Sequence, residues 1–205
     1  MNYPIPAEQS VAEVVIKKSR FIACARHIVS RETGMAWLEE IKAEYPDARH
    51  HCWAYLIGDP SCATNAGMGD DGEPSGTAGK PILNVLNHKK IGDVMIIVVR
   101  YFGGIKLGAG GLTRAYSQAA QAVMEILPTE QQVVMDRIQL ECDFSLEQQI
   151  RHWTGLVEGE VSEVNYGQQV EMLLLTPQNK TQDLIEQLES IQCIFKVLTD
   201  ERSPI

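Results

Sequence analysis

Residues 93–127 read DVMIIVVRYFGGIKLGAGGLTRAYSQAAQAVMEIL, and this stretch decides the fold of the larger part of the chain. Residues 93–100 are almost entirely apolar, which is typical of a strand that is buried on both faces. Residues 112–127 place apolar side chains at a period of 3.6 residues, which predicts an amphipathic helix. We therefore expect a central strand, a glycine-rich loop and a long helix that packs back on the sheet.

The segments before this stretch predict further strands and one more helix. Residues 11–17 and 20–28 are rich in β-branched and apolar residues, and we expect them to form two strands joined by a short turn. Ser30 is a good N-cap for a helix that ends before Pro46. Residues 51–57 predict a third strand. The N-terminal part therefore combines a sheet with several helices.

Backbone freedom is concentrated in the middle of the chain. Twelve of the 16 glycines fall between Gly58 and Gly111. Residues 58–79 predict a long irregular loop, and such a loop in a compact domain is usually functional or mobile. A short helix should follow from Lys80, because Pro81 suits the first turn of a helix.

The C-terminal part alternates between strand and helix patterns. We expect strands at residues 137–143, 161–166, 169–176 and 194–199. Ser145 and Asn179 each open a capping-box pattern, so we expect one helix after each of them. Gly167 joins the second and third strands as a tight hairpin. The resulting order, βαββαβ, is the ferredoxin-like split unit.

Charge separates the two parts. The chain has 18 basic and 27 acidic side chains and a net charge of −9. Residues 133–205 hold −8 of this charge, whereas residues 1–132 are nearly neutral. We place the boundary near residues 128–132, and we predict an N-terminal domain over 1–130 and an acidic ferredoxin-like domain over 133–205. The acidic balance argues against general coating of nucleic acid, but a local anion contact in the N-terminal domain is compatible with it.

The first candidate site is the glycine-rich loop over residues 100–114, RYFGGIKLGAGGLTR. A glycine-rich loop between a strand and a helix N-terminus offers free N–H groups, a positive dipole end and room for a ligand. We predict that an anion or RNA is bound here by Arg100, Gly103, Gly104, Lys106, Gly108, Gly110, Gly111, Thr113 and Arg114, with Lys80 from the neighbouring loop. The alternative is a tight loop whose glycines only permit packing. The spacing fits neither a Walker motif nor a dinucleotide fingerprint.

The second candidate site lies in residues 69–80, GDDGEPSGTAGK. The oxygen-bearing and imidazole side chains considered for it are Asp70, Asp71, Glu73, Ser75, Thr77 and His51. The three carboxylates are suited to a hard cation, but their spacing is not that of a calcium loop. The alternative is a solvated turn, because Asp, Gly, Ser and Pro dominate turns. We predict no metal centre.

The sequence contains no recognisable catalytic arrangement. It has no G-x-S-x-G or H-E-x-x-H motif, so we assign no catalytic residue and no cofactor. The five cysteines form no C-x-x-C pair, and we expect reduced thiols, with Cys24, Cys142 and Cys193 buried. No apolar run is long enough to span a membrane, and the N-terminus lacks a signal-peptide pattern. We therefore expect a cytoplasmic protein.

Two blocks of the sequence resemble the signature blocks of the IMPACT family. They are DDGEPSGTAGKPIL at residues 70–83 and VVRYFGGIKLGAGGLTRAY at residues 98–116. The resemblance implies an α+β protein, with the fold of the second domain of ribosomal protein S5 at the N-terminus and a ferredoxin-like domain at the C-terminus. It also implies a role in translation, because the family's eukaryotic members regulate translation through protein contacts.

Taken with the loop chemistry, the resemblance favours a non-catalytic, translation-associated protein. Its partners would be RNA, the ribosome, a translation factor or another phosphate-type anion. A first alternative is an enzyme that acts on a small phosphorylated or anionic metabolite, because S5-like folds also occur in small-molecule kinases. In that case the carboxylates of residues 70–73 would bind a cation or act as a base. A second alternative is a protein-interaction module whose acidic C-terminal domain recruits a basic partner.

Overall fold

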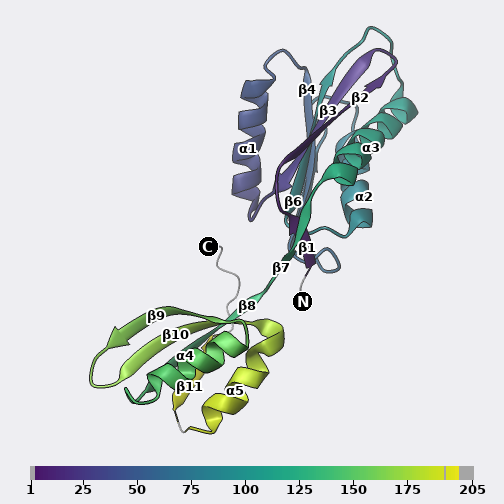
Figure 1. The fold of residues 1–205 in the computed structure, drawn as a ribbon. Coiled ribbons are helices and arrows are strands. Elements are labelled where there is room, and N and C mark those ends of the chain that lie inside the picture. The colour runs from purple at the N-terminus through teal and green to yellow at the C-terminus, as the bar shows by residue number, and fades with distance from the viewer. Residues whose placement is uncertain (1–2, 192, 199–205) are drawn as a thin grey trace. The chain divides into compact units, whose positions relative to one another are not determined.

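The computed structural model describes residues 3–191 and 193–198. Its contacts divide the chain into two compact units, and the boundary along the sequence lies between Gln132 and Val133. We refer to them as the N-terminal domain and the C-terminal domain, and each has its own hydrophobic core. The mixed α and β content of both domains confirms the predicted fold class (Figure 1).

A five-stranded antiparallel sheet forms the centre of the N-terminal domain, in the order β2-β3-β6-β4-β5. The strands are β2 (Ser10–Ile16), β3 (Ser19–His27), β4 (His50–Ile57), β5 (Asn65–Gly69) and β6 (Val94–Tyr101). Strand β6 lies in the middle, and residues 94–100 are all buried. The apolar run at residues 93–100 therefore forms the central strand, as predicted.

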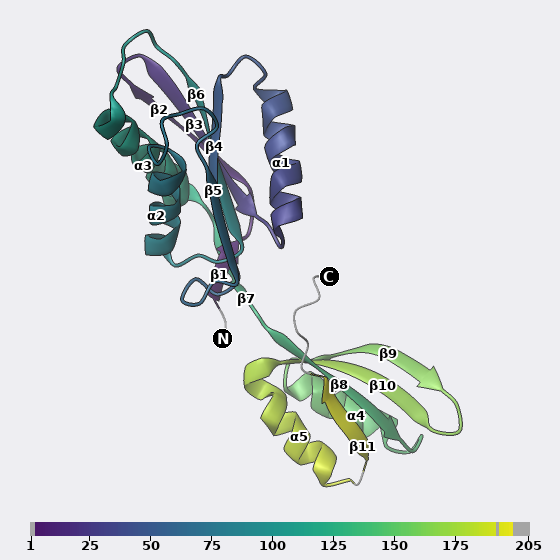
Figure 2. The same cartoon turned by 180° about the vertical axis from the view of Figure 1, so that it is seen from behind.

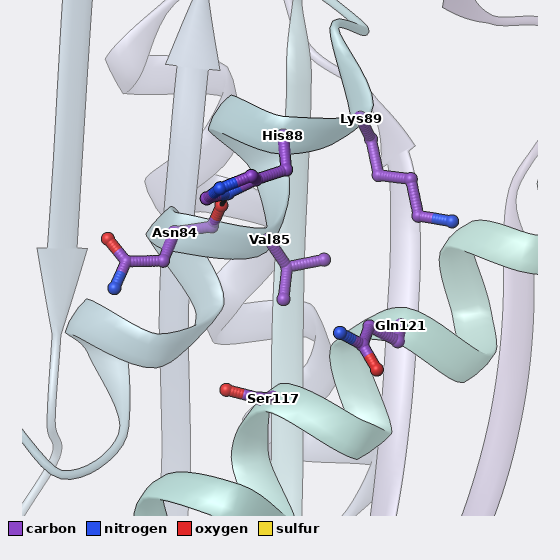
Figure 3. Close-up of a pocket in the computed structure, with 6 residues that line it drawn as sticks. All are labelled: Asn84, Val85, His88, Lys89, Ser117 and Gln121. Atoms are coloured by element: carbon purple, nitrogen blue, oxygen red, sulfur yellow. Dashed lines mark hydrogen bonds between the residues drawn. The ribbon is translucent and has the colours of Figure 1, made fainter.

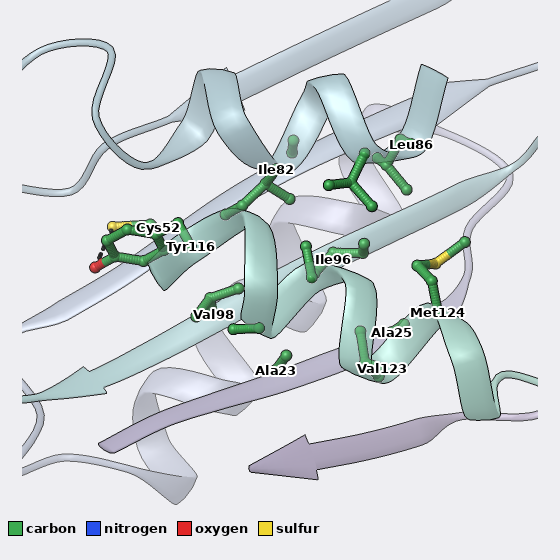
Figure 4. Close-up of a cluster of buried hydrophobic side chains, with 14 of the residues drawn as sticks. Ala23, Ala25, Cys52, Ile82, Leu86, Ile96, Val98, Tyr116, Val123 and Met124 are labelled. Atoms are coloured by element: carbon green, nitrogen blue, oxygen red, sulfur yellow. Dashed lines mark hydrogen bonds between the residues drawn. The ribbon is translucent and has the colours of Figure 1, made fainter. Parts of the chain in front are cut away.

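Three helices cover the two faces of this sheet. Helix α1 (Arg31–Glu44) lies on one face, and α2 (Gly79–Lys89) and α3 (Ala109–Ile126) lie on the other (Figures 1 and 2). Figure 4 shows the core beneath α2 and α3, where Ile82 of α2 and Val123 of α3 pack above β6. None of the described helices is long and apolar enough to cross a membrane.

Several loops meet at one end of the sheet. Arg20 at the start of β3 pairs with Tyr101, and His50 at the start of β4 pairs with Arg100. The β2–β3 turn and the last residues of β6 therefore lie together, and the loop to α3 follows from this end of β6. The segment before α2 reaches the same region, because its Glu73 pairs with Arg100 of β6. We call residues 17–19, 70–78 and 102–108, with the first turns of α2 and α3, the loop end of the N-terminal domain.

The expectation of an irregular loop over residues 58–79 is wrong in part, because this segment contains the edge strand β5. Its sequence, NAGMG, has no β-branched or aromatic residue and so carries no strand signal. A Cβ on Gly67 would come within 2.7 Å of the Tyr55 ring, and one on Gly69 within 2.6 Å of the Trp53 ring. The two glycines thus let β5 lie against a stacked aromatic pair on β4.

A second pairing was not predicted. Strand β1 (Tyr3–Pro6) pairs with β7 (Thr129–Gln132) in a two-stranded antiparallel sheet. The sequence predicts only a domain boundary at residues 128–132, because they separate two periodic segments. The Tyr3 hydroxyl donates a 2.6 Å hydrogen bond to the Asp93 carboxylate, which also accepts the Gly58 N–H at 2.7 Å. These long-range contacts, which local patterns do not reveal, hold the pairing against the main sheet.

The C-terminal domain has the predicted βαββαβ order. Its elements are β8 (Met135–Cys142), α4 (Glu147–Leu156), β9 (Glu160–Tyr166), β10 (Val170–Pro177), a short 3₁₀ turn η1 (Gln178–Lys180), α5 (Thr181–Glu189) and β11 (Ile194–Leu198). The sheet order is β11-β8-β10-β9, as in a ferredoxin-like fold. Residue 199, the last of the final predicted strand, lies outside the described residues.

Of the expected helix caps, only that of Ser30 is present. The Ser30 hydroxyl accepts the Thr33 N–H at 3.2 Å in a full capping box. The capping boxes expected at Ser145 and Asn179 are wrong, since neither α4 nor α5 has a side-chain cap. The Ser145 hydroxyl instead donates to the Asp143 carboxylate at 2.7 Å. A nearby carboxylate thus competes for the hydroxyl that the pattern assigned to the helix.

All five cysteines are free thiols. Cys24 and Cys142 are buried as predicted, whereas Cys193 is half-buried. Burial raises the pKa of the Cys24 thiol to about 12, so this group stays protonated and unreactive at neutral pH. Cys62 is the exposed cysteine.

Candidate functional site

The loop between β6 and α3 is fixed to the β2–β3 turn. A Cβ on Gly103 would overlap the backbone of Lys18, and the Gly103 N–H donates to the Ser19 hydroxyl at 3.1 Å. Lys17 and Lys18 both have positive φ, 45° and 67°, as a tight two-residue hairpin turn requires. The structure therefore places two lysines beside the predicted anion loop. Sequence patterns do not predict that these lysines lie beside the loop, because their position depends on the strand register.

The positions of the loop differ in why they require glycine. Gly104 and Gly108 have φ of +84° and +72°, a region that side chains other than glycine rarely adopt. Gly111 would bring a Cβ within 3.1 Å of Leu107. Gly110 is different: nothing lies within 4 Å of its hypothetical Cβ, and its φ is not positive. Neither packing nor backbone conformation within the described chain explains a glycine at position 110.

The start of α3 presents uncapped backbone donors. Gly108 is the N-cap residue, and no described side chain accepts a hydrogen bond from the first N–H groups of the helix. The Thr113 hydroxyl donates to the Ala109 carbonyl at 3.1 Å, so it leaves these N–H groups open. The helical ladder begins when the Leu112 N–H donates to the Gly108 carbonyl at 2.9 Å. Ala109 and Gly110 are exposed. The first N–H groups of α3 therefore point toward solvent at the positive end of the helix dipole.

The turn, loop and helices of this region carry five exposed cations. Lys80, Lys106 and Arg114 are exposed, as are Lys17 and Lys18. None of the five forms an ion pair with a described carboxylate. Residues 112–127 predict a helix that would hold Arg114 in its first turn, but the helix begins at Ala109, so Arg114 lies in the second turn of α3. The positive end of the helix dipole, which acts mainly on the first turn, therefore affects it little.

Arg100 is buried and is not a surface cation. Its guanidinium forms a 2.5 Å ion pair with the Glu73 carboxylate, and both side chains are less than a tenth exposed. The Tyr116 hydroxyl donates to the same carboxylate at 2.8 Å. The guanidinium also lies over the rings of Phe21 and Phe102, at 5.5 and 5.6 Å from their centroids. Arg100 thus anchors the 70–78 loop to β6 and cannot contact a ligand at the surface in this arrangement.

In the second candidate site, Asp70 caps helix α2. Its carboxylate accepts the N–H groups of Gly76, Ala78 and Gly79 at 2.7, 3.0 and 2.8 Å. Burial alone would raise the pKa of this carboxyl group, but the three N–H donors together lower the pKa below its ordinary value. The start of α2 is therefore already satisfied by a side chain, in contrast to the start of α3.

The other residues of this candidate site also have partners within the fold. Asp71 accepts the backbone N–H of His51 at 2.6 Å, and the His51 ring lies against the Tyr45 carbonyl at 3.2 Å. The Thr77 hydroxyl donates to the Pro74 carbonyl at 2.6 Å. Ser75 is exposed. Within the described residues, no three His, Cys, Asp or Glu side chains are arranged to hold a metal ion.

These contacts change the electrostatics of the loop end. Glu73 pairs with a buried guanidinium and Asp70 is half-buried against backbone N–H groups, so Asp71 is the exposed carboxylate of the three. The loop end therefore exposes Lys17, Lys18, Lys80 and Lys106 against this one exposed carboxylate. The structure brings most of the first predicted site together and gives the second a structural role.

Two hollows elsewhere in the protein do not involve the loop end. The larger, about 240 Å³, lies between α2 and α3 (Figure 3). It is lined by Asn84, Val85, His88, Lys89, Ser117 and Gln121. The other, about 190 Å³, lies on the C-terminal sheet, beside Leu173 and Glu163. The loop end is thus an open surface that is separate from both hollows.

Comparison with protein-family models finds two matches in this chain. The Impact N-terminal domain matches residues 17–124, which include the whole loop end. A domain of unknown function, DUF1949, matches residues 140–191 of the C-terminal domain.

Individual relatives extend this similarity over most of the chain. An IMPACT family member of Haemophilus influenzae is 44% identical over 143 residues, which cover 70% of this chain and 69% of the relative. The IMPACT family member YigZ of Escherichia coli is 38% identical over 165 residues, which cover 80% of this chain and 81% of the relative. A crystal structure described as that of a hypothetical protein is 32% identical, with a TM-score of 0.75 and 98% of each chain covered. This chain belongs to the IMPACT family.

Proposed function

We propose that this protein is translation-associated and binds RNA through the loop end of its N-terminal domain. The observation that carries the proposal is the open start of α3, where uncapped N–H groups and a glycine with no structural cause lie among exposed cations. A helix start of this kind is suited to a phosphate group. Membership of the IMPACT family supports the link to translation, which the resemblance implies for its eukaryotic members.

Gly110 supports an anion at this position. A glycine in a helix interior costs roughly 0.5–1 kcal/mol relative to alanine, and in the first turn it also costs helix stability. No neighbour in the described chain requires this glycine. A ligand that approaches the backbone at Gly110 would explain the missing side chain, because a Cβ would stand in its path.

The spread of the cations favours an extended polyanion over a single small anion. Lys18 lies on the β2–β3 turn, Lys80 in the first turn of α2 and Lys106 in the loop before α3. The turn and the loop before α3 are in contact through Gly103. A phosphodiester backbone has regularly spaced charges, so it can engage cations on several elements at once. The acidic C-terminal domain would repel the same backbone, so the binding surface belongs to the N-terminal domain.

The test is sedimentation of the full chain with ribosomes, together with RNA crosslinking. We expect association at low salt, and we expect Lys106→Glu/Arg114→Glu to abolish it. The matched control is Arg31→Glu/Lys89→Glu, which makes the same charge change at the opposite end of the domain, where α1 begins and α2 ends. No association of the wild type, or equal behaviour of the two double variants, would contradict the proposal.

The same contacts argue against the alternative that the protein is an enzyme acting on a small anionic metabolite. It requires the carboxylates of residues 70–73 to hold a cation or act as a base. Asp70 and Glu73 are instead bonded to the start of α2 and to Arg100. His51 is hydrogen-bonded within the fold and is largely buried. Using these groups in catalysis would require the loop end to rearrange.

A second candidate function, recruitment of a basic protein partner, is favoured by the outer face of the C-terminal sheet. Glu141 on β8 lies directly opposite Glu171 on β10, and both are exposed. Like charges at opposed strand positions are unfavourable, and a cationic partner would relieve this repulsion. Glu163 lies on β9, the next strand of the same sheet. A lysine-rich peptide should bind the full chain and should lose affinity for Glu141→Lys/Glu171→Lys; equal affinity for both proteins would exclude this role.

A further inference from the structure

The loop end also carries two exposed apolar side chains. Phe102 is 50% exposed and Ile105 is 42% exposed, on the same short loop as Lys106. Phe102 directly precedes Gly103, which packs on the β2–β3 turn that carries Lys18. An aromatic ring is therefore exposed among cations, which is the side-chain combination that proteins use to hold single-stranded nucleic acid.

The fold holds the Phe102 ring in place. The guanidinium of Arg100 lies over it, 5.6 Å from the ring centroid, and also lies over the buried ring of Phe21. Glu73 fixes this guanidinium through the buried ion pair. The turn contact of Gly103 fixes the backbone on the other side of Phe102. A ligand that stacks on the exposed part of this ring would spend little free energy on ordering it.

We propose that Phe102 is a stacking platform for an unpaired nucleobase, and that the RNA bound at the loop end is single-stranded there. This inference rests on the proposed function, since the cations must first hold the phosphate backbone. Every base has a π face that an aromatic ring can stack on, but in a duplex those faces are already covered by neighbouring base pairs. Phe102 therefore contributes to binding only when bases are unpaired.

The C-terminal domain supplies a matched control. Phe144 is 52% exposed, almost the same as Phe102, but it stacks on Tyr166 with ring centroids 6.3 Å apart. The Tyr166 hydroxyl donates to the Glu147 carboxylate at 2.9 Å. Asp143 precedes Phe144 in the chain and adds a further negative charge. A phosphate backbone would be repelled here, so exposure alone does not make Phe144 a platform.

The experiment measures binding of the full chain to a fluorescent oligouridylate and to a short RNA duplex at low salt. Phe102→Ala should weaken oligouridylate binding by roughly 5- to 150-fold, the range expected for loss of one base–aromatic stack. It should leave duplex binding unchanged. Phe102→Trp should retain oligouridylate binding, and Phe144→Ala should bind both probes like the wild type. Because the Phe102 ring is half exposed, we expect its variants to fold, and their thermal unfolding midpoints check this.

The possible results separate this inference from the proposed function. Oligouridylate binding that depends on Phe102 supports both. Oligouridylate binding that is equal in wild type and Phe102→Ala overturns the stacking role and leaves RNA binding at the loop end standing. An equal loss on the oligouridylate and on the duplex also overturns the stacking role, because it indicates a general contact. Binding of neither probe by the wild type overturns both.

Discussion

The glycines in the loop between β6 and α3 are required for different structural reasons. Gly103 is required by close packing on the β2–β3 turn, and Gly104 and Gly108 by positive φ. Gly110 has no such requirement. Most glycines of this loop are therefore explained by packing or by backbone conformation. Gly110 is the one that favours a ligand-binding loop over a loop that is only tightly packed.

Gly110→Ala tests this distinction at a single residue. We expect the variant to be more stable than wild type by about 0.5–1 kcal/mol, because alanine is the better helix former and its Cβ meets nothing. We also expect it to bind RNA more weakly, because the Cβ lies where the ligand approaches. Chemical denaturation and anisotropy titration measure the two effects. A variant that is more stable and binds RNA as wild type does would show that Gly110 has no role in binding.

Asp70→Asn tests the structural role of the acidic loop. The amide group cannot accept all three N–H bonds that the carboxylate accepts, so we expect a loss of about 1–2 kcal/mol in the free energy of unfolding at pH 7. The folded-state pKa of Asp70 lies below its ordinary value of 3.8. Its stabilisation is therefore complete above that ordinary value and is lost as the pH falls through the lower folded-state value.

The pH dependence gives this prediction its control. Denaturation of wild type and Asp70→Asn at neutral and strongly acidic pH should show a difference in stability that shrinks on acidification. A difference that does not change with pH would mean that the carboxylate charge is not what caps α2.

At the scale of elements, local patterns predicted those parts of the fold whose burial is periodic. Residues 94–100 of β6 form the buried central strand, and α3 buries the apolar stripe that the 3.6-residue period indicated. Local sequence patterns did not predict the two strands whose formation depends on long-range contacts. Strand β5 has two glycines that pack against two aromatic rings, and the polar strand β7 depends on pairing with residues far away in sequence.

The helix caps provide an element-scale prediction. Ser30→Ala should destabilise the protein by about 1 kcal/mol, because the Ser30 hydroxyl caps α1. Ser145→Ala should cost no more than a few tenths of a kcal/mol, because Ser145 bonds to Asp143 at an exposed site and caps no helix. Urea denaturation of both variants measures the difference. Equal losses would show that the sequence pattern at Ser145 had been the better guide to α4.

Local sequence patterns likewise predicted only part of the candidate site. The sequence correctly predicted a strand, a glycine-rich loop and a helix start with cations nearby. It assigned Arg100 to the ligand as one of the cations that flank the glycine-rich loop, but the structure buries its side chain against Glu73. It missed Lys17 and Lys18, because their proximity depends on the pairing of three strands.

For the molecule as a whole, a net charge of −9 does not describe the surface that a ligand meets. The excess negative charge belongs to the C-terminal domain, and Asp70 and Glu73 of the N-terminal domain are bonded within the fold. An acidic protein can therefore hold a local polyanion if the cations are gathered on one surface.

The salt dependence of binding tests this view of the charge. The logarithm of the RNA association constant should fall linearly with the logarithm of the salt concentration. Neutralising Lys18 or Lys106 to glutamine should each reduce the slope by roughly 0.7, the change expected when one phosphate contact to a single strand is lost. Lys89→Gln, at the far end of α2, should leave the slope as in wild type. A slope that does not respond to Lys18 or Lys106 would place the binding surface elsewhere.

The central claim, that RNA binds at the loop end, is tested most directly by identifying the residues that crosslink. The full chain is irradiated with ribosomes at low salt, and the crosslinked peptides are identified by mass spectrometry. We predict crosslinks within residues 17–20 and 101–114, with Phe102 among them, and their loss in Lys106→Glu/Arg114→Glu. Crosslinks confined to residues 133–198, or none at all, would contradict the account.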